Sequence, residues 1–486
     1  MACKWLGHRV VRALWPLSFL AAASAAVAPQ SGCGGAGSAG SAASPGDASP
    51  GDAGADEATT PADGSTSNDA GGGEASSTSD ASLGADAADA AVEGGPDAGA
   101  AHPLPALPLR TSSRWIVDAN GKRFKLASVN WYGAESKDFV VAGLDRATLP
   151  SIAALGRTLG FNSVRLPWSN ELVETNPVVD PAHVAKNPAL AGLHALDVLD
   201  AVVAALAHEG LVVVLDNHRS HADWCCDVAH GDGLWYAPGF PESSFLADWT
   251  TMAKRYASQP AVVGADLRNE LRTMLDPGAP ATCTACGTGC PCLDPTWTGD
   301  NGPTDWYGAA QRAGNAVLAA NPNLLVVVEG LGYSLDLGGV YHLPLTLDVG
   351  NRVVYSPHDY AFSHAANATY ADMAADLGNR WGFILEQNQP FTAPVWVGEF
   401  GTSHGSPTDV SDTSGQGFWF QSFRQYLANA DIDWSYWALN GTEATGYSRT
   451  LGAEEGYGVL DTTWSGSALA DLTKALQASQ PATQGP

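Results

Sequence analysis

The stretch VVGADLRNE, residues 262–270, begins as an apolar run and ends in an arginine, an amide and a carboxylate. The stretch PVWVGEFG, residues 394–401, has the same order, with Glu399 following its apolar part. Short continuous apolar runs of this kind predict strands that are buried on both faces, as in a parallel sheet. In both stretches the polar groups would therefore stand at the carboxyl end of a buried strand.

Six further runs with β-rich apolar residues occur along the chain, at 125–133, 162–168, 211–218, 323–330, 352–360 and 433–440. Amphipathic segments lie between the runs, for example 193–210, which ends at Gly210, and 305–322, which ends at Asn321 and Pro322. Eight strand and helix units predict an α/β fold, a (β/α)8 TIM barrel with long loops. A doubly wound sheet is the alternative.

In almost every run an ionisable, amide or aromatic side chain closes the apolar part: Asn130, Arg165, His218, Asn269, Glu270, Glu329, His358, Glu399 and Trp437. In a barrel these carboxyl ends meet at the catalytic face. Tyr360 follows His358 by two positions, so both side chains would point to the same face of a strand. We therefore expect a shared polar rim.

Glu270 and Glu399 are the strongest candidates for chemistry. A carboxylate after buried strand residues needs a partner or a raised pKa. Two carboxyl groups about 5 Å apart across a barrel mouth would form the pair of a retaining glycosidase, in which one is the acid/base and the other the nucleophile. Either glutamate alone would more often be structural. In such a pair we expect a raised pKa for the acid/base and a low one for the nucleophile.

Several neighbours could assist this pair. Asn269 could bond a sugar 2-hydroxyl, and Arg165 could hold the nucleophile ionised. His218 and His358 could donate to the nucleophile or bind hydroxyls, although a structural histidine is the better reading of each one alone. Tryptophans close to strand ends could stack on sugar rings. Trp437 is a candidate by itself, and the other four are candidates only as a group: Trp131, Trp168, Trp224 and Trp235.

Composition divides the 486-residue chain into unequal parts. Residues 34–101 contain no aromatic residue and neither Lys nor Arg, which predicts a disordered linker. The net charge is −27, of which −18 remains in the compact part because the first 101 residues hold 12 of the acidic and 3 of the basic residues. A negative surface of this size disfavours nucleic acid and anionic membranes as partners, but not neutral polymers.

The amino terminus predicts export. Three basic residues precede a short, largely apolar run from Ala13 to Ala28. Cleavage could follow the triplet Ala23 to Ala25, or precede Cys33, which would then be lipidated and provide the only membrane anchor. The predicted domains are an export signal at 1–32, a linker at 33–101 and a catalytic domain at 102–486.

The remaining cysteines form an even set: Cys225, Cys226, Cys283, Cys286, Cys290 and Cys292. The string CTACGTGCPC at 283–292 could suggest a zinc knuckle, but disulfides are favoured in an exported protein. Their pairing cannot be deduced from sequence. We expect no metal.

The motifs FNSVRLPW, LDNH, LRNE, SPHDY, WVGEFG and WSYWALN, in this order, resemble glycoside hydrolase family 5, the cellulase-like retaining enzymes. The resemblance covers the compact part. It implies Glu270 as acid/base and Glu399 as nucleophile, with Arg165, His358 and Tyr360 near the nucleophile. Sugar-binding roles are expected for the other positions, namely Asn130, Trp131, His218, Asn269 and Trp437.

The resemblance implies a monomeric endo-β-glycosidase that acts on β-1,4-linked polysaccharide without a cofactor. A β-mannanase, or an enzyme for a glycoside with a non-sugar aglycone, remains open. The alternative of a different class is a non-catalytic glycan-binding surface lipoprotein. Such a protein has no reason to keep both glutamates together with Asn269, Arg165 and Tyr360.

Overall fold

The structure is a computed structural model that describes residues 101–224, 231–284, 286, 289–365, 368–404 and 415–486. Its main sheet is parallel, in the order β10-β9-β6-β5-β4-β3-β13-β12-β11. The strands are β3 (Ala127–Asn130), β4 (Ser163–Ser169), β5 (Val212–Arg219), β6 (Val262–Asp266), β9 (Leu325–Glu329), β10 (Val353–Ser356), β11 (His358–Asp359), β12 (Trp396–Phe400) and β13 (Asp433–Tyr436). Each of the eight predicted runs corresponds to these strands, and β4 and β5 extend one residue beyond their runs.

The sixth predicted run is divided by Pro357 into β10 and β11. Proline has no amide hydrogen to give to a ladder, so a strand is interrupted there. The strand β10 pairs with β9, and β11 pairs with β12. Across the gap the Tyr355 amide donates to the Pro394 carbonyl at 3.0 Å, and the Gly398 amide donates to the Pro357 carbonyl at 3.1 Å. The sheet thus closes into a barrel, and the doubly wound alternative is wrong.

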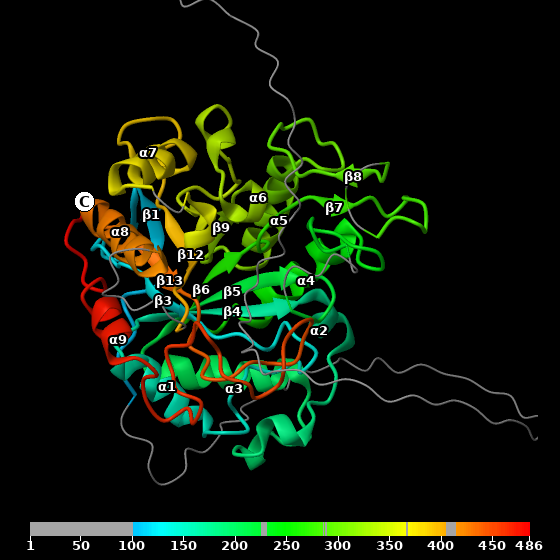
Figure 1. Cartoon of the computed structure of the whole chain (residues 1–486), viewed down its shortest axis with the longest axis vertical. Coiled ribbons are helices and arrows are strands. Elements are labelled where there is room, and N and C mark those ends of the chain that lie inside the picture. The colour runs from blue at the N-terminus through cyan, green and yellow to red at the C-terminus, as the bar shows by residue number, and fades with distance from the viewer. Residues whose placement is uncertain (1–100, 225–230, 285, 287–288, 366–367, 405–414) are drawn as a thin grey trace, which may run out of the picture. The chain divides into compact units, whose positions relative to one another are not determined.

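Helices surround the strands, which lie at the centre of the fold (Figure 1). The predicted segments 193–210 and 305–322 contain α3 and α5, and Gly210 has φ +72°, the left-handed conformation that ends a helix. The helices are α1 (Leu149–Thr158), α2 (Asn170–Thr175), α3 (Ala195–His208), α4 (Glu242–Arg255), α5 (Trp306–Ala320), α6 (Leu331–Ser334), α7 (Tyr370–Arg380), α8 (Gly415–Ala430) and α9 (Ala470–Gln477). Short 3-10 turns lie at Pro181–Val184, Pro188–Leu190, Gly338–Tyr341, Ala361–Ser363 and Gly382–Leu385.

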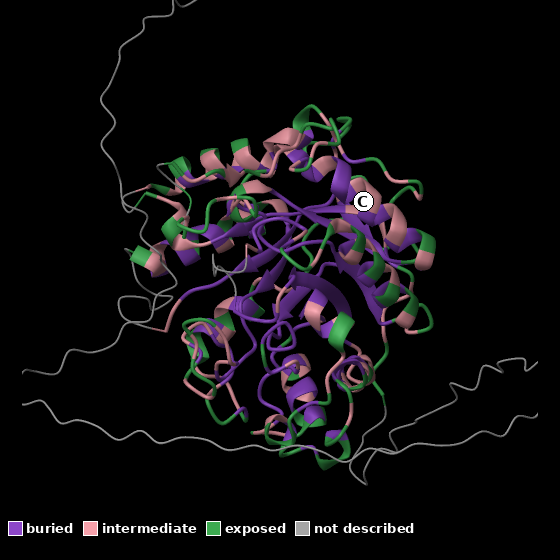
Figure 2. Ribbon diagram, turned by 90° about the vertical axis from the view of Figure 1, so that its right-hand side faces the viewer, coloured by how far each residue is buried: buried purple, intermediate pink, exposed green. Residues whose placement is uncertain are grey.

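The interior of the barrel has an apolar end and a polar end. The apolar end is filled by Leu109, Ile116, Leu126, Val212, Val214, Val263, Leu325, Val327, Val354 and Trp396. Ile116 comes from a hairpin that the sequence did not predict, formed by β1 (Arg110–Ser112) and β2 (Trp115–Val117). Figure 2 shows the strands buried and the exposed residues on the outer helices and loops. The apolar end supports the polar residues that follow it on each strand.

The loop after β6 carries an antiparallel pair, β7 (Met274–Leu275) and β8 (Cys292–Leu293). Disulfides join Cys283 to Cys290 and Cys286 to Cys292, which confirms the disulfide prediction for this loop. Cys225 and Cys226 lie outside the described residues, as do the predicted export signal and all of the predicted linker except Ala101. Among the helices that the structure describes, none has the length and apolar character needed to span a bilayer.

Candidate active site

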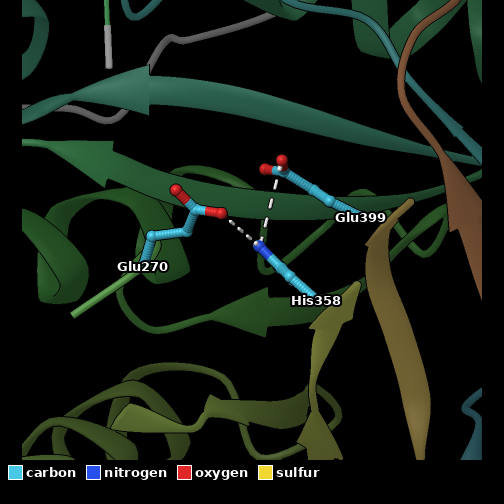
Figure 3. A group of neighbouring side chains, drawn as sticks. All are labelled: Glu270, His358 and Glu399. Carbon is cyan, nitrogen blue, oxygen red and sulfur yellow. Dashed lines mark hydrogen bonds and ion pairs between the residues drawn. The ribbon is translucent and has the colours of Figure 1, made fainter. Parts of the chain in front are cut away.

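The two candidate glutamates face each other at the carboxyl ends of the strands, with His358 between them (Figure 3). His358 lies beside Glu399 in the register of β11 and β12. Its Nδ1 is 3.1 Å from Glu270 Oε1 and 3.9 Å from Glu399 Oε2. One oxygen of each carboxylate and a ring nitrogen of His358 all lie within 4.8 Å of one another. This spacing fits a retaining pair and is too short for an inverting pair, whose carboxyl groups stand about 6.5–9.5 Å apart.

Tyr360 contacts the second glutamate, as its position two residues after His358 predicts. Its hydroxyl donates to Glu399 Oε2 at 3.1 Å. Arg165 Nη1 donates to the other oxygen, Oε1, at 2.7 Å. Glu399 is therefore held from two sides, and its carboxylate plane is fixed by donors on β4 and after β11.

Arg165 is fully buried and lies at the centre of a ring of acceptors. Beyond Glu399 it donates to Asn130 Oδ1, Asn269 Oδ1, Glu329 Oε1 and Asp266 Oδ2 at 2.9–3.1 Å, and it is 3.1 Å from Asp216 Oδ1. A guanidinium suits this place because its donors lie in one rigid plane. The ring forms the floor of the site.

His218 and Asn269 stand together at the ends of β5 and β6. His218 Nδ1 is 2.7 Å from Asp216 Oδ2, and its Nε2 is 3.4 Å from Asn269 Nδ2. Because Arg165 bonds the amide oxygen of Asn269, the amide nitrogen faces His218. Asn269 therefore bonds Arg165 directly, and His218 contacts Asn269.

The predictions for Asn130 and most of the tryptophans need correction. The Asn130 amide donates to Gly398 O and Ser435 Oγ at 3.0 Å, and the side chain is 0% exposed, so it supports the floor and has no free group for sugar. Trp131 is also 0% exposed, and its Nε1 donates to Ala142 O. Large aromatic rings bury much apolar surface, and the ring of Trp131 packs in the core.

The same correction applies to Trp168 and Trp235, which are buried against Trp249 and Trp306 respectively. Trp437 lies at the site: its ring stacks on Tyr132 with centroids 5.1 Å apart and lies 5.7 Å from the ring of His218. Trp224 packs edge-on against Trp437 and Tyr132. Trp224 and Trp437 are therefore the members of the predicted group that keep a place beside the pair.

The pKa shifts of the two glutamates are the reverse of the prediction. Burial raises the pKa of Glu270, but the hydrogen bond and charge of His358 outweigh burial and lower it. Burial raises the pKa of Glu399, and the charges of His358 and Arg165 offset only part of this rise. The directions differ because His358 makes a hydrogen bond to Glu270, whereas the charge of Glu270 further raises the pKa of Glu399. Burial lowers the pKa of His358, but Glu329, Glu399 and the bond to Glu270 raise it well above its usual value.

Three carboxylates complete the floor: Asp216 and Asp266 were missed from the sequence, and Glu329 was placed on the rim without a role. All are fully buried, and together they could offer ligands to a cation, a place that the Arg165 guanidinium fills. A sequence signal for Asp216 exists, because it precedes His218 by two positions and so shares its face. Among the described residues, the other group of possible metal ligands is Glu270, His358 and Glu399. His358 and Glu270 are already joined by a hydrogen bond.

Comparisons with known proteins agree with this site. The family model described as Cellulase (glycosyl hydrolase family 5) matches residues 117–443. An endoglucanase of Paenibacillus polymyxa is 34% identical over 347 residues, which cover 68% of this chain and 79% of the relative.

Two solved structures are similar as well. The catalytic domain of the major endoglucanase from Xanthomonas campestris pv. campestris has a TM-score of 0.61 and 27% identity, and the match covers 76% of this chain and 99% of that one. A cellotetraose complex of an endocellulase from Pyrococcus horikoshii has a TM-score of 0.62 and 26% identity, over 78% of this chain and 100% of that one. All three relatives are named as enzymes, which favours an enzyme over a glycan-binding protein.

Proposed function

The chain belongs to glycosyl hydrolase family 5 and is a cellulase-like endo-β-glycosidase, and from this premise we propose that it cleaves β-1,4-linked glucan with retention of configuration. The observation that carries the proposal is the spacing of Glu270 and Glu399, whose nearest oxygens lie within 4.8 Å. Inversion requires a water molecule between the base carboxylate and the sugar, and this spacing leaves no room for it.

In the first step Glu399 attacks the anomeric carbon. Its oxygen forms a bond to that carbon while the bond from the carbon to the glycosidic oxygen breaks, and Glu270 gives its proton to the leaving oxygen. Arg165 and Tyr360 support this role, because their donors hold Glu399 in one orientation at 2.7 and 3.1 Å. The orientation lowers the entropy that the attack must lose.

In the second step the ester between the sugar and Glu399 is hydrolysed. Glu270, now a carboxylate, takes a proton from water, and the water oxygen bonds to the anomeric carbon as Glu399 leaves. The bond to Glu399 that forms in the first step is broken in the second, and Glu270 regains its proton, so the enzyme returns to its starting state. Two successive inversions leave the original configuration at the sugar.

The proton that Glu270 donates is shared with His358. In the resting site His358 Nδ1 is 3.1 Å from Glu270 Oε1, close enough for the proton to lie on either partner. Burial raises the pKa of Glu270, and the hydrogen bond and charge of His358 lower it, so the bond between the two residues controls how readily Glu270 holds the proton. A sugar that displaces water then favours the neutral pair, in which Glu270 is the acid.

We assign the sugar next to the cleaved bond to Trp437, with Asn269 and His218 bonding its hydroxyls. The proximity of Trp437 to His218, with ring centroids 5.7 Å apart, supports this assignment. Specificity for mannan in place of glucan would change the contacts at the sugar 2-position and would leave the reaction the same.

We further propose that the protein is exported and acts as a monomer, outside the cell or tethered to its surface through lipidated Cys33. Support comes from the amino-terminal sequence and from the relative in Xanthomonas campestris, whose curated name is major extracellular endoglucanase. The predicted linker at 33–101 would give the catalytic domain reach from an anchor.

Hydrolysis of a panel of soluble β-glucans, mannans and xylans by the full-length protein tests the proposal. We expect cleavage of β-1,4-glucan that is lost in Glu399→Ala and kept in Glu386→Gln, an exposed glutamate outside the site. Cleavage of mannan alone would replace the substrate but keep the mechanism. Equal turnover in Glu399→Ala and wild type would contradict the mechanism.

A further inference from the structure

Glu329, the last residue of β9, contacts Glu270, His358 and Arg165. Its Oε2 accepts from the Glu270 amide at 2.7 Å, and its Oε1 accepts from Arg165 Nη2 at 2.9 Å. The same Oε1 lies 3.3 Å from His358 Nε2, and the side chain is fully buried. We propose that Glu329 is a positioning residue that holds the backbone of Glu270 and the proton on His358, and so sets the pH range in which Glu270 acts as the acid. The proposal rests on the function proposed above.

The backbone of Glu270 needs such support. Its φ is +44°, in the left-handed region that residues with a side chain adopt only when the surrounding structure holds them there. Two bonds hold this conformation: the Glu270 amide donates to Glu329 Oε2, and Arg272 Nη1 donates to the Glu270 carbonyl at 3.0 Å. The conformation determines where the Glu270 carboxylate stands, which is within bonding distance of His358.

The two nitrogens of His358 face different carboxylates. Nδ1 faces Glu270 at 3.1 Å, and Nε2 faces Glu329 at 3.3 Å. A neutral imidazole carries one proton, so it can satisfy only one of them as a donor. With Glu329 ionised at Nε2, the ring keeps a proton there and presents a second proton at Nδ1 to Glu270. Glu329 therefore makes His358 a donor toward the acid rather than an acceptor.

Other charged groups act on the same ring, and they are not equivalent to Glu329. Asp216 from β5, Asp266 from β6 and Glu399 from β12 interact electrostatically with the ring. Arg165 from β4, His218 from β5 and Tyr360 after β11 act on the glutamates that face it. Glu399 Oε2 lies 3.9 Å from Nδ1. Within the described residues, the ion-pair contact of Nε2 is with Glu329.

Removal of the charge on Glu329 has a predictable sign. Glu270 and His358 share a proton that dissociates as pH rises. The negative charge of Glu329 beside Nε2 raises the pH at which this proton dissociates. The variant Glu329→Gln keeps an oxygen that can accept from the Glu270 amide but removes the anion. We expect the alkaline limb of the kcat/KM profile to move to lower pH by about 1 unit or more, the usual effect of one charge at this range.

Asp266→Asn is the matched control. Asp266 is also buried and also bonds Arg165, at 2.9 Å, but it makes no bond to the Glu270 amide. Burial and the charge of Glu329 raise the pKa of Asp266, and its carboxylate bonds Arg165 rather than His358. We expect its alkaline limb to stay within about 0.3 unit of wild type, a shift smaller than one neighbouring charge produces.

Kinetic and spectroscopic measurements together decide the matter. A Glu329→Gln enzyme that is slower but keeps the wild-type alkaline limb overturns the proposal, and so do equal shifts in the two variants. If Glu329→Gln does not fold, the wild-type protein still tests the proposal through the NMR titration of His358, assigned by comparison with His358→Asn. We expect His358 to remain protonated well above its usual pKa of about 6.5; a titration at or below that value overturns it. This readout does not depend on turnover, so failure of the proposed function would be seen separately.

Discussion

Replacement of Arg165 by methionine tests the structural floor of the site. Methionine is similar in length but carries no charge, so the variant leaves four buried carboxylates without their common partner: Asp216, Asp266, Glu329 and Glu399. Loss of one member of a buried ion pair costs about 3–5 kcal/mol. That is a fifth or more of the about 5–15 kcal/mol that stabilises a typical domain.

Urea unfolding at pH 7, followed by tryptophan fluorescence, measures this loss. The matched control is Arg255→Met, in α4, where Arg255 bonds Asp197 and Asp200 at 2.6–2.8 Å but is 27% exposed. A pair of that kind contributes about 0–1 kcal/mol. We therefore expect the free energy of unfolding to fall at least threefold more in Arg165→Met than in the control.

The loss should also depend on pH. Without the guanidinium, the folded-state pKa of the remaining carboxylates rises above the value in the unfolded chain. A carboxylate shifted in this direction destabilises the fold increasingly as pH rises through the unfolded pKa of about 4 toward the folded one. The deficit of Arg165→Met should therefore be smaller at pH 4 than at pH 7. Equal losses in the two arginine variants, or a deficit that does not change with pH, would refute the reasoning.

Three other changes have expected outcomes. Tyr360→Phe removes the donor to Glu399 Oε2, and because a bond to a charged group contributes about 1.5–3 kcal/mol, we expect kcat to fall about 10-fold to 100-fold with little change in KM; an unchanged kcat would contradict the role. Burial raises the pKa of Asp232, but a hydrogen-bonded histidine and two arginines lower it to about 2, so Asp232→Asn should cost about 2 kcal/mol at pH 7, and the cost should disappear as pH falls from about 4 to about 2; a cost that persists in acid would exclude this linkage. The double variant Cys283→Ser/Cys290→Ser opens a loop of sequence separation 7 and should lower the free energy of unfolding by about 2 kcal/mol, as measured by thermal melting without reductant; an unchanged melting temperature would show that the loop unfolds independently.

The sequence predicts the barrel well because its strands are continuous apolar runs with polar ends. This local pattern is enough to place Glu270, Glu399, Arg165 and Tyr360 on one rim, where the structure brings them into contact. The division at Pro357 could be suspected from the residue itself. The strands β10 and β11 pair with different neighbours because the sheet closes into a barrel. Barrel closure depends on residues far apart in the sequence.

Other features could not be predicted because they depend on distances across the barrel. Trp131 and Trp437 both stand at strand ends, but only the packing around them decides that the first is core and the second borders the site. The reversed pKa shifts of the two glutamates depend on the hydrogen bond of His358 to Glu270, because His358 lies 3.1 Å from Glu270 and 3.9 Å from Glu399. Sequence gives the residue types but not a difference of this size.

The most direct test of the central claim is to trap the covalent intermediate. A 2-deoxy-2-fluoro-β-cellobioside with an activated leaving group slows the second step more than the first, so the sugar accumulates on the nucleophile. Digestion and mass spectrometry then locate it. We predict a label on the peptide that contains Glu399, and none when Glu399→Gln is treated in the same way. A label on Glu270, or steady turnover to the inverted product without any labelled peptide, would contradict the account.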